Sequence, residues 1–397
     1  MSGMAPSERT DIVPSDEAYA PQIQVLLDGQ DVTDNLMDDV IDLKVTLQRD
    51  ELGGFSMQLA NHREWSLGGK PRVPDGTYRH SDNDSIDVFM PVSVAMGYVG
   101  RMKQLFVGEI TMLQPAFPSS GMPTFSVTGT DILNRLRRAK PSGDTSRSFE
   151  NQADWEIAKR IAERHGLQYS SRSVTKGDKN KLVSQKDQDD LSFLLYLAKK
   201  NDYEACVIIE DKKPKLLFGK PTDKRDGEKV KVYALQYGQS LISFTPKLRI
   251  ASQVSSVTVR GWNSRLKKKF EYKATSKDLP KTGGEGKTGP ERVEKQLTAK
   301  EERIVDRPVQ SQQEAKNLAI QILTETANQY LTGSGEAMGD PRIVPGVNLQ
   351  LTGLGSRFDG VYYVTKATHS YGASGYTTAF DVERLTDNFT GELKKRD

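Results

Sequence analysis

The sequence predicts a mainly β protein that carries a smaller α+β segment in its middle. Apolar residues alternate with polar ones in several runs near the N-terminus, which is typical of strands with one buried face. Between residues 154 and 200 the apolar spacing changes to three and four residues, which indicates helices. Alternation returns after residue 241, so the 397 residues are expected to form two or three domains.

The predicted first domain covers residues 21–140 and follows a polar tail, residues 1–20, that we expect to be flexible. Asp28-Gly29 is a turn signal, and a glycine pair at residues 53–54 indicates a hairpin. Six strands without a long helix between them favour an antiparallel sandwich or barrel, closed by a short helix over residues 131–138. The expected strands are residues 23–27, 41–47, 55–59, 86–98, 105–112 and 124–128.

A small α+β module is predicted over residues 141–235. Its first helix, residues 154–165, stops at Gly166. Its second helix, residues 187–200, begins with acidic residues and ends with lysines, an order that suits the helix dipole. Two short apolar runs, residues 206–209 and 216–218, are expected to form a hairpin.

The third predicted domain, residues 236–390, begins with a strand around residues 254–259 and contains a charged insertion, residues 262–305. Between residues 261 and 307 there are 13 Lys or Arg against 8 Asp or Glu, around a glycine-rich centre, so much of the insertion is expected to be mobile. Ser311 and Glu314 form a capping box that starts a helix over residues 311–330. Three strands follow, at residues 347–351, 361–368 and 376–385.

Composition excludes several classes of function. The single cysteine, Cys206, rules out an internal disulfide framework and a multi-cysteine zinc site, and it is expected to be a small buried apolar residue. A net charge of +3 is too close to neutral to indicate a protein that binds nucleic acid over much of its surface. The first 20 residues lack the apolar core of a secretory signal, and no stretch approaches the ~18 uncharged apolar residues that a membrane helix needs.

Two motifs resemble nucleotide-binding signatures but fail on spacing. Gly286-Lys287-Thr288 lacks the earlier glycine that a phosphate-binding loop requires, because that position is Lys281. Residues 353–358 lack the third glycine of a dinucleotide fingerprint, so we interpret them as a hairpin turn.

Three residues with catalytic potential are better explained by structural roles. His369 could belong to a catalytic triad only if the chain also had a nucleophile, and the sequence contains no G-x-S-x-G nucleophile elbow. This favours a structural role for His369, as a hydrogen-bonding histidine inside the fold. Asp189 and Asp190 are neighbours in a first helical turn, where acids favour the dipole and adjacent side chains point apart. The sequence therefore predicts no catalytic residue, no metal ligand and no cofactor.

The predicted partner-contact site is Lys267-Lys268-Lys269 together with Trp262 and Phe270. Lysines beside aromatic residues are typical of polyanion binding. Acidic residues follow soon after in the sequence, which favours a solvated loop or a protein-docking loop.

Several local patterns occur in a suggestive order. Residues 187–203 (DQDDLSFLLYLAKKNDY) lead into a hairpin that ends in LLFG at residues 216–219. Residues 344–353 (VPGVNLQLTG) precede FDGVYYVTK, then His369 and GYTT. These patterns, with Asp131-Ile-Leu after residues 125–129, resemble the late control D family, the hub proteins of contractile phage tails. The resemblance covers residues 21–385.

The resemblance implies two tube-like antiparallel β-barrel domains with the α+β module between them and the insertion facing baseplate components. Three chains would place six barrels in a ring that stacks on a hexameric tail tube and seats a three-fold spike. The implied partners are a homotrimer, the tail tube protein, a separate trimeric spike protein and baseplate wedge proteins. The implied location is the virion tail baseplate, assembled in the bacterial cytoplasm, with no membrane contact and DNA at most passing through the lumen.

The resulting hypothesis is a non-enzymatic structural hub of a contractile phage tail or a related injection system. Exposed strand edges are stable when they are paired or covered, so edges at residues 88–98 and 361–368 are expected to make contacts between barrels. The spike is expected to be a separate polypeptide, because few residues follow the last predicted strand. Two alternatives remain, a particle-associated cell-wall hydrolase and a nucleic-acid-binding module that uses the basic insertion.

Overall fold

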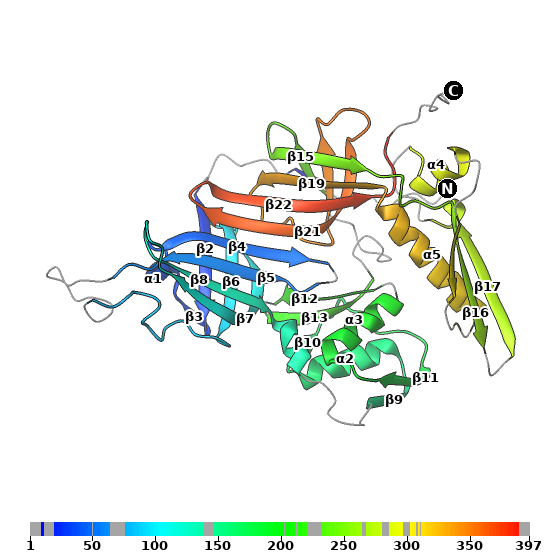
Figure 1. The fold of residues 1–397 in the computed structure, drawn as a ribbon, viewed down its shortest axis with the longest axis horizontal. Coiled ribbons are helices and arrows are strands. Elements are labelled where there is room, and N and C mark those ends of the chain that lie inside the picture. Colours follow the sequence, from blue (N-terminus) through cyan, green and yellow to red (C-terminus); the bar gives the residue numbers. More distant parts are fainter. Residues whose placement is uncertain are drawn as a thin grey trace.

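A sheet of 14 strands connects the N-terminal and C-terminal parts of the chain in the computed structural model. Figure 1 shows the N-terminal strands (blue to cyan) beside the C-terminal strands (orange to red), with a green helical unit below them and a yellow hairpin at the far end. The predicted mainly β fold class is confirmed. The structure describes residues 9–11, 20–49, 51–63, 76–138, 147–201, 203–211, 213–220, 232–263, 267–279, 286–296, 302–306, 309 and 311–388.

The N-terminal part contains six main strands in the order β4-β5-β8-β7-β6-β2, and the two-residue strand β3 pairs with the outer side of β2. All neighbours are antiparallel. Alternate residues such as Leu43 and Met57 point into one core. The predicted turn at Asp28-Gly29 is confirmed, because both residues have positive φ, as a two-residue hairpin turn requires. The elements are β2 (Pro21–Leu27), β3 (Gln30–Asp31), α1 (Thr33–Leu36), β4 (Val40–Gln48), β5 (Gly54–Ala60), β6 (Pro91–Tyr98), β7 (Lys103–Ala116), β8 (Thr124–Asp131) and the 3₁₀ helix η1 (Ile132–Arg138).

The strand expected at residues 86–98 starts late. β6 begins at Pro91, because Phe89 adopts a φ of 65° and donates its N–H to the Ile110 carbonyl at 2.8 Å. Residues 86–90 therefore form a turn in front of the strand, and the expectation of a thirteen-residue strand was wrong. The left-handed backbone at a bulky residue could not be inferred from the alternation.

The middle of the chain has its own hydrophobic core, built from two helices and short strands. The hairpin of β12 and β13 carries a third, parallel strand, β10, and β11 pairs with β9. Cys206 is half-buried on β12, less buried than expected. The elements are β9 (Arg147–Gln152), α2 (Asp154–Arg164), β10 (Gln168–Tyr169), β11 (Asn180–Gln185), α3 (Asp190–Lys200), β12 (Glu204–Glu210) and β13 (Lys213–Gly219).

The C-terminal part contains six more strands in the order β15-β19-β22-β21-β20-β14 around a third core. The predicted boundary at residue 235 placed residues 232–235 in the α+β module, but they form β14, a strand that the sequence did not predict and that pairs with β20 in this sheet. The short strand β1 (Arg9–Asp11) pairs in parallel with the outer side of β14. The six strands are β14 (Val232–Gln236), β15 (Leu241–Leu248), β19 (Leu331–Met338), β20 (Asn348–Thr352), β21 (Gly360–Gly372) and β22 (Gly375–Arg384).

Much of the predicted insertion forms a folded unit. β16 lies between β17 and β18, and the helix α5 packs on one face of this sheet to form a fourth core. The capping box is confirmed in part, because the Ser311 hydroxyl accepts the N–H of Glu314 at 3.1 Å. The elements are β16 (Ser256–Asn263), β17 (Lys268–Thr275), η3 (Ser276–Asp278), α4 (Gly289–Gln296), β18 (Glu302–Asp306) and α5 (Gln312–Asn328).

The two six-stranded parts repeat one topology. When the strands of each part are numbered in chain order, both sheets follow the order 2-3-6-5-4-1. The second strand of each sheet has a register shift at the same place, between Val40 and Asp42 in one and between Leu241 and Ser243 in the other. The fifth strands, β7 and β21, also share a shift. One difference breaks the repeat, since β14 is parallel to β20 whereas β2 is antiparallel to β6.

The two parts are joined inside the chain through β4 and β21, which pair over seven residues from Gln48–Lys366 to Asp42–Gly372. The expectation that residues 361–368 contact the other barrel therefore holds for their last three residues. Residues 88–98 make no strand pairing with the other part in the described structure, because β6 is paired with β2 on one side and β7 on the other. Their contact with the C-terminal part is made by the ring of Tyr98, whose centre lies 5.8 Å from that of Tyr376 on β22.

Candidate interaction surfaces

The hairpin of β16 and β17 carries the five predicted contact residues, and four of them are exposed or lie at its turn. Trp262 is 57% exposed and pairs across the ladder with Lys269. Lys267 and Lys268 are exposed at the start of β17. Phe270 packs in the core beneath α5 and is 8% exposed, so the prediction that it contacts a partner was wrong. Alternation along β17 explains this, because Phe270 faces the helix while Lys269 faces outward.

Acidic side chains neutralise most of the positive charge on the outer face of this sheet. Glu271 lies 3.0 Å from the ammonium group of Lys269 and 3.3 Å from Nε of Arg260. The hydrogen bond from Lys269 lowers the pKa of the Glu271 carboxyl. Lys273 likewise pairs with Glu302 at 3.2 Å. A face of paired charges around an exposed tryptophan suits a protein partner better than a phosphate backbone, which needs unpaired cations.

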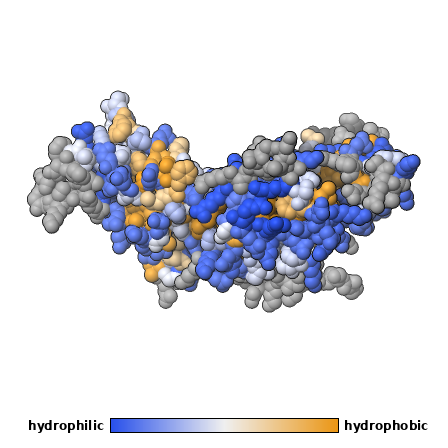
Figure 2. All heavy atoms as spheres, turned by 90° about the horizontal axis from the view of Figure 1, so that it is seen from below, coloured by the Kyte–Doolittle hydropathy of each residue, from blue (hydrophilic) through white to orange (hydrophobic). Residues whose placement is uncertain are grey.

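Exposed apolar side chains gather on the N-terminal sheet. Phe89 and Met122 are exposed by 65% and 60%, and Val99, Met112 and Phe117 are also exposed. Figure 2 shows this apolar surface on the part of the molecule formed by the N-terminal strands. Exposed apolar surface of this kind is typical of protein–protein contacts.

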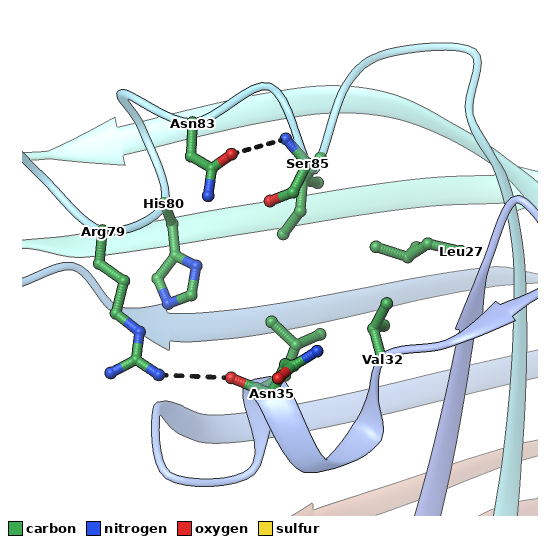
Figure 3. Close-up of a pocket in the computed structure, with 9 residues that line it drawn as sticks. Leu27, Val32, Asn35, Arg79, His80, Asn83 and Ser85 are labelled. Carbon is green, nitrogen blue, oxygen red and sulfur yellow. Dashed lines mark hydrogen bonds between the residues drawn. The ribbon is translucent and has the colours of Figure 1, made fainter. Parts of the chain in front are cut away.

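A pocket of about 230 Å³ lies beside α1 in the N-terminal part (Figure 3). Asp39 fixes two side chains at its rim, because its carboxylate lies 2.8 Å from Nε of Arg79 and 2.9 Å from Nε2 of His80. No carboxylate lines the pocket, whereas glycoside cleavage uses two. The lining residues are Leu27, Val32, Asn35, Leu36, Arg79, His80, Asn83, Ser85 and Ile86.

His369 is fully buried between strands and has three hydrogen-bond partners. Its Nε2 lies 3.0 Å from the carbonyl oxygen of Ile343, so Nε2 carries the proton and donates it. The single lone pair of Nδ1 is then shared by the hydroxyls of Tyr376 at 2.8 Å and Thr378 at 3.1 Å. Burial lowers the pKa of His369 to about 4. The predicted structural role of this histidine is confirmed by these contacts.

The depressed pKa of His369 predicts a loss of stability in acid. Between pH 6.5 and 4 the unfolded chain binds this proton and the folded chain does not, so the free energy of unfolding falls by about 3 kcal/mol as the pH is lowered. Urea unfolding at pH 7 and pH 4.5 measures this. His369→Gln should show a smaller difference between the two pH values, and equal differences for both proteins would contradict the assignment.

Asp190 is the centre of a buried ion cluster at the start of α3. Its carboxylate lies 2.7 Å from Nη1 of Arg147 and 2.9 Å from Nη1 of Arg164. It also accepts hydrogen bonds from Gln185 at 2.8 Å and from His165 at 2.9 Å. Although burial acts in the opposite direction, these hydrogen bonds lower the pKa of Asp190. The cluster ties the start of α3 to β9, β11 and the end of α2.

The neighbouring Asp189 has a different role. It caps α3, where its Oδ1 accepts the N–H of Ser192 at 2.8 Å. The two carboxylates thus serve separate groups, as the sequence predicted, and they do not form an acid–base pair.

The motif at residues 286–288 is part of a helix start. The Thr288 hydroxyl accepts the N–H of Glu291 at the first turn of α4, and the Glu291 carboxylate accepts the Thr288 N–H at 2.8 Å. A Cβ atom on Gly286 would lie 1.6 Å from the carbonyl oxygen of Asp387, so the C-terminal segment occupies the space beside this glycine. Lys281 lies outside the described residues. The stretch at residues 353–358 connects β20 and β21, which confirms the hairpin interpretation.

A buried polar network, which no sequence pattern predicted, joins three parts of the chain. The Tyr363 hydroxyl on β21 donates to Glu204 on β12 at 2.6 Å. The guanidinium of Arg49 lies 5.4 Å from the centre of the Tyr363 ring, and its Nη1 is 3.3 Å from Glu383 on β22. Asn328 of α5 also donates to Glu383 at 3.1 Å. These contacts hold both sheets and the α+β module in one arrangement.

Among the described residues, no group of three or more His, Cys, Asp or Glu side chains could hold a metal ion. The helices in that part of the chain are all too short or too polar to cross a membrane.

The fold recurs in proteins of phage tails and secretion systems. The 43 kDa tail protein of prophage MuSo2 from Shewanella oneidensis is similar with a TM-score of 0.65 and 14% identity, over 92% of this chain and 99% of that one. A tail protein from Neisseria meningitidis MC58 has a TM-score of 0.64 and 10% identity, over 92% and 97% of the two chains. An Escherichia coli component of the type VI secretion system has a TM-score of 0.53 and 11% identity, over 94% and 79%.

A comparison with curated proteins finds no match. The family described as the Alg8 N-terminal domain matches residues 70–372, which is more than half of the chain. The chain therefore belongs to the family described as the Alg8 N-terminal domain, and it has the fold of phage tail proteins and of a type VI secretion component.

Proposed function

We propose that this protein is a non-enzymatic structural hub of the late control D type. Three copies would link the six-fold tail tube to the three-fold spike of a contractile phage tail or a related contractile injection system. The repeated sheet carries this proposal, because two equivalent units in one chain let a trimer present six units to the tube. The fold shared with phage tail proteins supports the same setting.

The proposed mechanism is symmetry matching and transmission of force, without bond making or breaking. The barrel units would be residues 21–140 and 236–390, the second extended at its start by β14, with the rest of the predicted α+β module, residues 141–235, between them. The outer face around Trp262 and Lys269 would contact baseplate wedge proteins. The spike would be a separate trimeric protein, and the assembled complex would sit in the virion tail baseplate.

Native mass measurement tests the trimer. At micromolar concentration, alone or with the spike protein, mass photometry should show a species of about three times the mass of one chain. A stable monomer under both conditions would overturn the proposal. Release of muropeptides from peptidoglycan would favour the hydrolase alternative, and a duplex-DNA shift lost on replacing Lys267, Lys268 and Lys269 would favour the nucleic-acid alternative.

A further inference from the structure

Within the 14-stranded sheet, eight strands from the two six-stranded parts form one antiparallel series, β15-β19-β22-β21-β4-β5-β8-β7. Every neighbouring pair in this series is antiparallel, including the junction of β21 and β4. Because eight is even, the end strands β15 and β7 run in opposite directions. If a second copy is placed beside the first by rotation about the axis of a ring, its β15 would therefore run antiparallel to β7 of the first copy.

The two ends of the series are the counterparts of the strands that already join. β15 corresponds to β4, and β7 corresponds to β21, by strand order and by shared register shifts. β20 pairs with the first part of β21 and leaves residues 366–372 to β4. β6 likewise pairs with β7 up to Glu109, so no described residue pairs with residues 112–116 on that side.

Both ends are open edges in the described part of the chain. β15 pairs there with β19, apart from a single bridge between its first residue, Leu241, and Tyr237, and the second half of β7 pairs with β8 alone. Exposed apolar side chains lie in these strands, Ile242 in β15 and Met112 in β7, and just after them, Ile250 and Phe117. An open edge with apolar side chains is a surface for strand pairing.

We propose that β15 of one copy pairs with residues 112–118 of the next copy, in the register of the β4–β21 junction. This proposal rests on the trimer of the proposed function and assigns the strands that close it. When β15 is matched to β4 and β7 to β21 at their register shifts, Leu248 lies opposite Leu113 and Phe244 lies opposite Phe117. They correspond to the Leu47–Ala367 and Leu43–Tyr371 pairs inside the chain.

Proline makes this junction weaker than the one inside the chain. Arg249 donates its N–H to Tyr330 on the β19 side at 2.8 Å, so Pro246, three residues earlier, faces the open edge. Pro115, the counterpart of His369, faces the other open edge. The two prolines stand opposite each other, and the pair lacks both N–H donors. The free chain is thereby protected against unspecific edge pairing, and assembly between copies depends on concentration.

Disulfide cross-linking tests the register. In a Cys206→Ser background, Thr245→Cys is combined with Ala116→Cys, which the register places in a non-hydrogen-bonded pair with closely spaced Cβ atoms. Lys44→Cys with Ser370→Cys is the equivalent pair inside one chain and serves as the positive control. Thr245→Cys with Gln114→Cys, shifted by two residues, is the negative control.

Oxidation of the 245/116 protein should give covalent dimers and trimers, at least tenfold more than the 245/114 protein, while the 44/370 protein stays one chain. A native trimer that does not cross-link at 245/116 would overturn this junction and leave the hub proposal standing. Cross-linked species larger than trimers would support the junction and contradict the trimer. A monomer without cross-links would overturn both.

Pro246→Val tests the weakening by proline, because Val45 occupies the equivalent position in β4. The restored N–H should lower the concentration at which half of the chains are assembled by about fivefold per junction. Lys247→Val is the matched control. The backbone N–H of residue 247 points toward β19, so this substitution should leave that concentration unchanged. Equal assembly of the Pro246→Val protein and the wild type would contradict the role assigned to this proline.

Discussion

Replacing Asp190 by alanine should destabilise the α+β module by about 3–5 kcal/mol. The substitution removes the carboxylate that Arg147, Arg164 and His165 share, and leaves positive groups without a counter-charge in a partly buried site. Hydrogen exchange of peptides from residues 147–220 measures the effect locally, which matters in a protein with several cores.

Asp189→Ala is the matched control for that experiment. It removes the cap of the same helix and should cost about 1 kcal/mol, because Asp189 is only half-buried and makes no contact with the cluster arginines that the structure describes. If both variants lost the same protection from exchange, the cluster would have no stabilising role beyond that of a helix cap.

Gly129→Ala should cost about 2–3 kcal/mol, although it adds a single methyl group. The new Cβ would lie 2.5 Å from the Phe55 ring and 2.7 Å from the carbonyl oxygen of Glu109, so a packed ring and a strand must both move. Gly54→Ala in the adjacent strand is the control, since its nearest neighbour would be 3.4 Å away. Urea unfolding followed by fluorescence compares the two, and a Gly129→Ala protein as stable as Gly54→Ala would show that the sheet yields freely.

The sequence predicted strands best where alternation and turn residues agree, as in β2, β4, β5 and β8. It missed β19, whose Gly333 and Gly335 have low strand propensity. The structure explains both glycines, because Cβ atoms there would lie 2.4 Å from the Phe244 ring and 2.7 Å from the Phe380 ring. Rings from neighbouring strands cover the glycines, and this long-range packing leaves no local signal.

The candidate surfaces were predicted in part. The hairpin at Trp262 was found because lysines and an aromatic residue adjoin in the sequence. The ion pairs that neutralise Lys269 were not foreseen, since Glu271 faces the same side through strand alternation. The network of Arg49, Glu204 and Tyr363 joins distant parts of the sequence, and the partners of its central hydrogen bond, Glu204 and Tyr363, are 159 positions apart. No local pattern in the sequence marks such a pair.

The β4–β21 ladder also sets the order in which the chain can fold. Thr46 and Thr368 face each other across it but are 322 positions apart in the sequence. At a synthesis rate of 5–20 residues per second, β4 waits roughly 15–60 s on the ribosome for its second neighbour. The N-terminal sheet can form in that interval, whereas the joined sheet forms after synthesis of β21, as contacts of high sequence separation form late. The nascent chain therefore exposes the β4 edge for most of its synthesis, the period in which a chaperone would have the most effect on yield.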